Sequence, residues 1–164
     1  MIHRWKKKLR QGKEGENLLI KTYPNLFRLY EEGNEYDLDI IPTDKTLEVK
    51  TEYYSIVAGH PRYSPNFFME IISDIQSGKL GGPYRAAKDG IDYFLSLFIL
   101  DRAIFWFNDV PTLAQRVESL SSNFVVKNVM NEGWITQGYA MPRELFKDLF
   151  IQIPLGVDHE EFYK

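Results

Sequence analysis

The sequence contains no cysteine and only three histidines among its 164 residues. Disulfides and thiolate zinc sites are therefore excluded, and the lack of cysteine fits a reducing compartment. The histidines (His3, His60 and His159) lie too far apart for the His-Glu-X-X-His spacing of a zinc-binding helix. The Gly-X-Gly-X-X-Gly fingerprint and the serine nucleophile elbow are also missing. These absences argue against zinc-helix, dinucleotide and serine-hydrolase chemistry.

The sequence also lacks a long apolar run. The longest, residues 93–100, is too short to cross a bilayer and is interrupted by Ser96. The first residues are charged, without the apolar segment of a signal peptide. With 44% apolar and 26% charged residues, the composition is that of a globular protein, and 164 residues can bury a full core. We therefore expect a single cytoplasmic domain over residues 1–164.

Acidic residues are missing from the first 13 positions, which hold six of the 20 basic residues. The net charge of −3 therefore combines an N-terminal arm of +6 with a body of −9. Such an arm is typical of a segment that contacts phosphate groups, and equally of a solvated helix start. Trp5 slightly favours the contact, since an indole among cations suits stacking. The candidate nucleic-acid-binding residues are Arg4, Lys6, Lys7, Lys8 and Arg10.

Hydrophobic periodicity divides the chain into short elements. Apolar residues at helical spacing predict a helix over residues 12–23, which Pro24 ends. Two alternating runs, 36–41 and 46–52, flank a polar turn and predict a β-hairpin. The other expected elements are strands at 27–30, 66–72, 91–100, 103–107 and 124–129, and helices at 84–88, 112–120 (with Thr112 as a cap) and 142–150.

This order of elements predicts one α/β domain with a mixed central β-sheet flanked by helices. The runs 91–100 and 103–107 are almost entirely apolar, as expected for a core hairpin covered on both faces. We divide the chain into the basic arm (1–13), a core (12–107) and a C-terminal extension (108–164) that carries no specific motif.

The predicted hairpin at 36–52 concentrates charged side chains on one surface. Side chains alternate faces along a strand, so Glu48 and Lys50 point the same way and Val49 the other. Asp37 and Asp39 share one face of the preceding strand in the same manner. Either aspartate can lie across from Glu48, which would place two carboxylates and one amine together.

Two adjacent carboxylates repel each other unless a cation lies between them. Mg²⁺ prefers oxygen ligands and binds through one or two carboxylates while it keeps water and phosphate oxygens as further ligands. A bound Mg²⁺ or Mn²⁺ would acidify a water molecule, and Lys50 would stabilise developing negative charge. The backbone carbonyl of Val49 is a further candidate ligand. The pattern therefore predicts metal-dependent hydrolysis of a phosphate ester.

The series Asp37, a turn, then Glu48-Val49-Lys50 in a hairpin resembles the PD-(D/E)XK nuclease superfamily, which includes restriction enzymes and junction resolvases. The resemblance implies a restriction endonuclease-like αβββαβ core and a Mg²⁺-dependent endonuclease that hydrolyses DNA phosphodiesters. It also implies a further metal-site Glu on the first helix, and Glu16 occupies that place. Tyr36 stands where the family often has proline, so Asp39 remains an alternative to Asp37.

A looser resemblance covers residues 66–94. The segment 66–70, a glycine-rich loop and the segment 91–94 are similar to small phage-type nucleases of the same superfamily. We interpret Glu70 as a surface or outer carboxylate. Gly81-Gly82 lacks the phosphate-loop pattern, and a simple turn is the more common explanation.

Two other interpretations remain open. The charged strand face is also common in half-exposed hairpins, and Glu-X-Lys occurs often by chance. The chain could therefore be a non-catalytic DNA-binding or interaction module with a nuclease-like fold, or a virion structural protein. For the nuclease we expect DNA as partner, no membrane, and a homodimer or larger homo-oligomer, because cutting opposed strands often requires two-fold symmetry.

Overall fold

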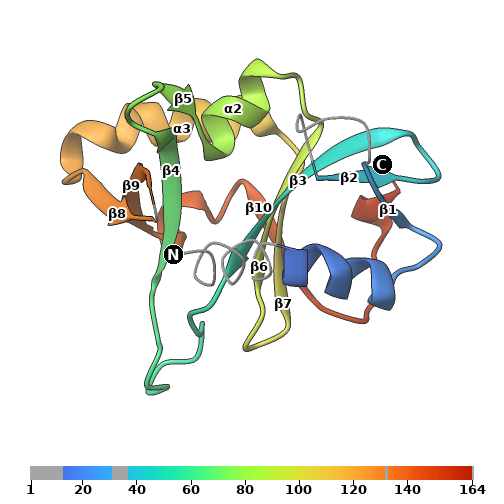
Figure 1. Cartoon of the computed structure of the whole chain (residues 1–164). Coiled ribbons are helices and arrows are strands. Elements are labelled where there is room, and N and C mark those ends of the chain that lie inside the picture. Colours follow the sequence, from blue (N-terminus) through green and yellow to red (C-terminus); the bar gives the residue numbers. More distant parts are fainter. Residues whose placement is uncertain (1–12, 31–36, 132, 164) are drawn as a thin grey trace.

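The computed structural model describes residues 13–30, 37–131 and 133–163, which form a mixed α/β domain (Figure 1). The arm candidates Arg4, Lys6, Lys7, Lys8 and Arg10 therefore lie outside the described residues. Within the described part, a six-stranded sheet has the order β1-β2-β3-β6-β7-β10. Its strands are β1 (Phe27–Leu29), β2 (Leu38–Ile40), β3 (Lys45–Glu52), β6 (Tyr93–Phe98), β7 (Ala103–Phe107) and β10 (Phe150–Pro154).

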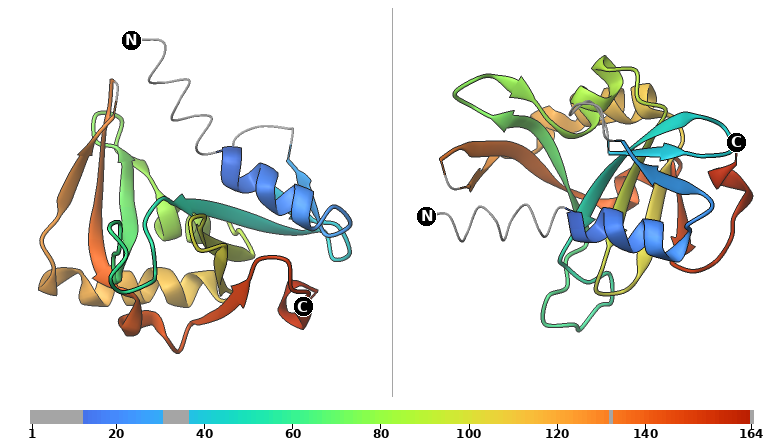
Figure 2. Two further views of the ribbon diagram at one scale, coloured as in Figure 1. Left: turned by 90° about the horizontal axis from the view of Figure 1, so that it is seen from below. Right: turned by 45° about the vertical axis from the view of Figure 1, so that its right-hand side comes forward.

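A second sheet lies against the first and has the order β5-β4-β9-β8 (Figures 1 and 2). All of its neighbouring strands are antiparallel. Because we expected one central sheet, the division into two is a correction. The predicted strand at 66–72 is present, but it belongs to this second sheet. Its strands are β4 (Asn66–Asp74), β5 (Lys79–Leu80), β8 (Lys127–Met130) and β9 (Ile135–Pro142).

The six-stranded sheet is mixed because β3 and β6 run parallel, while its other neighbours are antiparallel. The expected hairpins β2–β3 and β6–β7 are both present. All residues of β6 and β7 are buried, in agreement with their continuous apolar character.

Each face of this sheet has its own core. The helix of residues 13–22 packs on one face, where Leu19 contacts a cluster that includes Leu47, Leu95 and Trp106. On the other face, β4 and the helices α2 (Gly82–Lys88) and α3 (Val110–Leu120) cover a phenylalanine-rich cluster. Phe67 of β4 lies within 6.0 Å (ring centroids) of Phe98, Phe105 and three further phenylalanines of that cluster.

The expected helix at 142–150 is wrong. Strand β9 continues to Pro142, a single 3₁₀ turn follows at Arg143–Phe146, and Phe150 begins β10. Strand β10 pairs with the open edge of β7, with Phe150 opposite Phe107. The pairing satisfies a row of backbone groups that a helix would leave exposed, so tertiary contacts override the local helical pattern.

The expected cap of α3 is also corrected. The N-cap is Asp109, whose carboxylate accepts hydrogen bonds from the backbone N–H (3.1 Å) and the hydroxyl (2.7 Å) of Thr112. Short 3₁₀ turns occur at Ser121–Asn123 and Glu160–Phe162. Among the described residues, no helix is both long enough and apolar enough to cross a membrane.

Candidate metal-dependent catalytic site

The site begins where β2 and β3 separate. Leu38 pairs with Leu47, and the register places Asp37 next to Glu48. The Asp37 backbone N–H donates to the Leu47 carbonyl (3.2 Å), and the Asp37 carboxylate accepts from the Val49 N–H (2.7 Å). Asp37 lies just before β2, and its N–H and carboxylate continue the hydrogen bonding of that strand to β3.

Glu48 and Lys50 point away from the core that buries Leu47, as alternation along β3 requires. They line a pocket of about 70 Å³ between the two sheets. The pocket is lined by Glu48, Val49, Lys50, Phe68, Glu70, Gly82 and Phe94.

Glu16 approaches from the helix of residues 13–22. Gly15 makes the close approach possible, since a Cβ there would overlap the Thr51 hydroxyl on β3. Burial raises the pKa of Glu16 to about 8, and the charge of Asp37 and a hydrogen bond with it act in the same direction. The helix thus brings Glu16 to Asp37.

Glu48 shows the same electrostatic conflict. Its pKa is raised to about 8, first by burial and then by the charges of Asp37, Glu16 and Glu70, while the charge of Arg85 opposes the rise. Burial also raises the pKa of Asp37, against the Val49 hydrogen bond. Burial and mutual repulsion therefore both oppose the presence of three negative charges in this group.

These residues suit a divalent cation in their donor chemistry but not in their present arrangement. In the part of the chain that the structure describes, no group of three or more His, Cys, Asp or Glu side chains lies ready to hold a metal ion. The donor chemistry nevertheless fits: Glu48 Oε2 is buried without a hydrogen-bond partner, and the neighbouring donors are carboxylate and carbonyl oxygens. A cation would also relieve the repulsion that raises the two pKa values.

Asp39 lies apart from this group. It pairs with Thr46 across the hairpin, and its carboxylate contacts the Arg28 guanidinium at 3.3 Å. Of the two aspartates that the sequence left open, the structure brings Asp37 to Glu48 and Val49.

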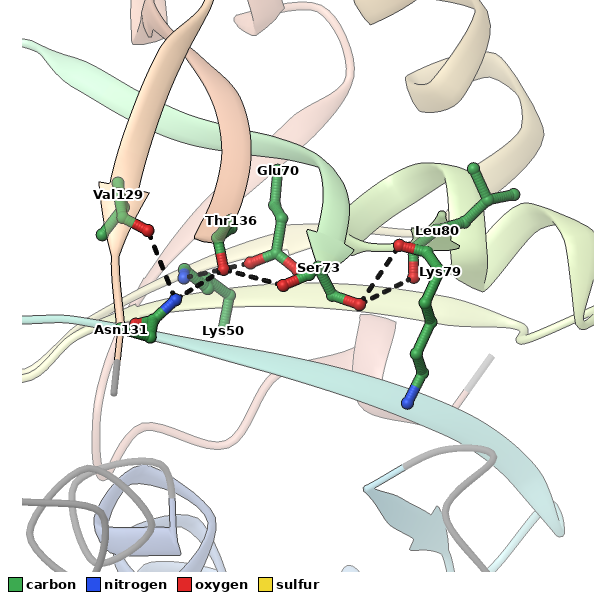
Figure 3. Close-up of polar contacts among 8 residues, drawn as sticks. All are labelled: Lys50, Glu70, Ser73, Lys79, Leu80, Val129, Asn131 and Thr136. Carbon is green, nitrogen blue, oxygen red and sulfur yellow. Dashed lines mark hydrogen bonds and ion pairs between the residues drawn. The ribbon is translucent and has the colours of Figure 1, made fainter. Parts of the chain in front are cut away.

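For Glu70 the sequence leaves two positions open, on the surface or as an outer carboxylate of the site. It is largely buried, not on the surface, and its carboxylate lies 4.0 Å from the Lys50 ammonium (Figure 3). The same ammonium lies 5.7 Å from the centre of the Phe68 ring. A Cβ at Gly81 would overlap the Glu70 carboxylate, so the Gly81-Gly82 turn has a specific role in seating it.

Hydrogen bonds within the second sheet hold the strand that carries Glu70 (Figure 3). The buried Thr136 hydroxyl on β9 donates to the Ser73 carbonyl (2.9 Å), and Asn131 donates to Thr136 (2.8 Å). The Ser73 hydroxyl in turn donates to the carbonyls of Lys79 and Leu80 in β5. Glu70 therefore lies on a sheet whose strands are joined by side-chain hydrogen bonds as well as by backbone pairing.

Arg85 and Glu52 also belong to the surroundings of the site. Arg85 of α2 lowers the pKa of Glu48, Asp37 and Glu70 through its charge. Glu52 at the end of β3 is buried with one carboxylate oxygen unpartnered, and burial raises its pKa. The sequence could have indicated Glu52, because it follows Glu48 and Lys50 at the same spacing along β3. Arg85 has no sequence signal beyond its nearness to Gly81-Gly82.

Comparison with known proteins gives no significant match to any protein-family model, curated protein or solved structure.

Proposed function

We propose that the chain is a metal-dependent endonuclease that hydrolyses DNA phosphodiester bonds. The observation that carries the proposal is the convergence of Glu16, Asp37 and Glu48, with Lys50 in the same pocket as Glu48. Buried acids with strongly raised pKa values and a defined charge partner are typical of functional sites. A structural role for three mutually repelling carboxyls would cost stability.

The metal would be held by the carboxylates of Glu16, Asp37 and Glu48 and the carbonyl of Val49. Mg²⁺ or Mn²⁺, when bound, supplies charge that polarises the phosphate and acidifies a water molecule. The Val49 N–H fixes the Asp37 carboxylate at 2.7 Å, so this group is oriented before any ligand binds.

Lys50 would act on the substrate. Its side chain is 35% exposed, so the ammonium can reach a phosphate in the pocket mouth. There it donates hydrogen bonds to oxygens on which negative charge develops. Glu70 and the Phe68 ring orient the ammonium from the second sheet.

A homodimer or larger homo-oligomer is part of the proposal, because one site per chain cuts one strand at a time. Sedimentation of the active protein tests this part separately. A monomer that still makes double-strand breaks would contradict it.

The test is incubation of plasmid and branched DNA with Mg²⁺, Mn²⁺, Ca²⁺ or EDTA. We expect cleavage with Mg²⁺ and Mn²⁺, binding with little cleavage in Ca²⁺, and none in EDTA. Full activity in excess EDTA would rule the proposal out.

The second candidate is a DNA-binding module without catalysis. One observation favours it: the described acidic side chains do not lie as a ready metal group. Binding of DNA without cleavage in any metal would support this candidate, and neither binding nor cleavage would favour a structural protein.

A further inference from the structure

The loop of residues 53–65 between β3 and β4 differs in charge from the rest of the body. It holds no acidic residue, whereas the body as a whole carries −9. Its charged and titratable groups are Arg62, His60 and three tyrosines. A surface of this composition suits an anionic, aromatic partner, although the body as a whole is acidic.

Two of the three tyrosines of the loop face solvent. Tyr54 is 50% exposed and Tyr63 is 41% exposed, so neither is needed to fill a core. The Arg62 guanidinium lies 5.9 Å from the centre of the Tyr54 ring. Tyrosine rings beside an arginine are the groups on which unpaired bases stack in single-strand-binding proteins.

The loop is held in one conformation by its own backbone. The Ser55 N–H donates to the Arg62 carbonyl and the Ser64 N–H donates to the Ser55 carbonyl, both at 3.0 Å. Tyr63 is tied in the same way, because its N–H donates to the His60 carbonyl at 2.9 Å.

Two half-buried side chains from other turns hold the base of the loop. The Asp101 carboxylate accepts hydrogen bonds from the Ser55 hydroxyl and the Ile56 N–H, both at 2.8 Å. The Arg143 guanidinium donates to the carbonyls of Ser64 and Asn66. Rings on such a fixed support lose little conformational entropy when a ligand stacks on them.

The loop also lies close to the candidate site along the chain. It leaves β3 directly after Glu52, the strand that carries Glu48 and Lys50, and returns as β4, which carries Glu70 (Figure 1). At about 3.3 Å per residue, Tyr54 is no more than about 13 Å of chain from Lys50. A DNA strand a few nucleotides long spans that distance.

We propose that Tyr54, Tyr63 and Arg62 form a stacking platform for unpaired bases of a single-stranded DNA segment beside the candidate site. The inference rests on the proposed function, which it deepens: it assigns DNA with a single-stranded segment, such as a fork or flap, as the substrate class. Paired bases do not offer their faces to the rings, so the platform discriminates against continuous duplex.

The test measures binding without cleavage. Fluorescence anisotropy in EDTA follows labelled oligo-dT, a matched duplex and a fork, bound to the full chain. The variants are Tyr54→Leu, Tyr63→Leu and both together, with Tyr54→Phe and Tyr63→Phe as conservative variants. Tyr163→Leu is the matched control, because Tyr163 is 47% exposed and lies outside the loop.

We expect each leucine variant to weaken binding of oligo-dT and of the fork by roughly tenfold. The phenylalanine variants and the control should stay within about twofold of the wild type, and duplex binding should not change. Thermal unfolding verifies that each variant is folded.

Failure of oligo-dT to bind the wild type, an unchanged affinity in the double leucine variant, or an equal loss with duplex would overturn the platform. The proposed function fails differently, through absence of metal-dependent cleavage. If the platform variants lose oligo-dT binding while Mg²⁺ supports no cleavage, the platform stands and the nuclease proposal falls.

Discussion

The Asp37 carboxylate accepts a 2.7 Å hydrogen bond from the backbone N–H of Val49, the residue between Glu48 and Lys50. This contact joins the start of β2 to the middle of β3 and places the two carboxylates of the hairpin side by side. Asp39, two residues along, pairs instead with Arg28. One hydrogen bond thus distinguishes two aspartates that the sequence pattern treats alike.

The two aspartates should respond differently to removal of charge. Asp37→Asn should lower the cleavage rate by about a hundredfold or more, because a proposed ligand of the metal would lose its charge. Asp39→Asn should retain activity within a fewfold, since its partner Arg28 lies away from the pocket. Initial rates on one DNA substrate measure both variants. If both remain fully active, the assignment of the hairpin to the site is wrong.

Substitutions of Glu48 and of Lys50 should have different effects on metal binding and on catalysis. Glu48→Ala should lose both metal affinity and activity. Lys50→Ala should keep metal binding but lose about a hundredfold or more in rate, because a charged lysine cannot bind a metal yet stabilises the transition state. Calorimetric titration with Mn²⁺ and cleavage rates provide the two measurements. Loss of metal binding in Lys50→Ala would contradict these roles.

The buried carboxyls make the stability of the metal-free protein fall as pH rises. The folded-state pKa values of Glu16 and Glu48 are raised from 4.5 to about 8. The folded protein therefore binds more protons than the unfolded chain between these values, so stability present below pH 4.5 is lost as pH rises to about 8. We expect a lower melting temperature at pH 8.5 than at pH 5.5.

Two further measurements test this expectation. The double variant with Glu16→Gln and Glu48→Gln should show a flatter dependence of melting temperature on pH. Mg²⁺ should raise the melting temperature of the wild type more at pH 8.5 than at pH 5.5, because at pH 8.5 it no longer competes with protons. A pH dependence that is identical in the double variant would show that other groups cause it.

The N-terminal arm lies outside the described residues, so its role stays a prediction from charge. Removal of residues 1–10 should weaken DNA binding and flatten its salt dependence, by about one unit of log–log slope for each phosphate that the arm neutralises. Binding is measured at several salt concentrations, with circular dichroism as the folding control. An unchanged slope in a folded truncation would exclude the arm as a DNA-binding segment.

The hairpin could be predicted from the sequence because its information is local. Alternation places Glu48 and Lys50 on one face, and Leu38, Ile40 and Leu47 are buried as the pattern requires. The helix of residues 13–22 could likewise be predicted, from its hydrophobic periodicity and from Pro24, which ends it. These elements supply the three proposed acidic ligands.

The second sheet could not be predicted in the same way. Strand β4 is a strand by its own pattern, but its partner β9 lies far along the chain, and their pairing depends on tertiary contacts. Glu70 reaches Lys50 only through that arrangement. For the same reason the local sequence after Pro142 predicts a helix, because the open edge of β7, with which β10 pairs, is not visible in it.

The most direct test of the central claim is cleavage of DNA by wild-type protein and Glu48→Gln, purified in parallel and assayed in Mg²⁺ and in EDTA. Parallel purification matters because a contaminating nuclease would be present in both preparations. The account predicts cleavage by the wild type in Mg²⁺ alone and a loss of at least about a hundredfold in Glu48→Gln. Equal cleavage by the two proteins, or none by the wild type in either Mg²⁺ or Mn²⁺, would contradict it.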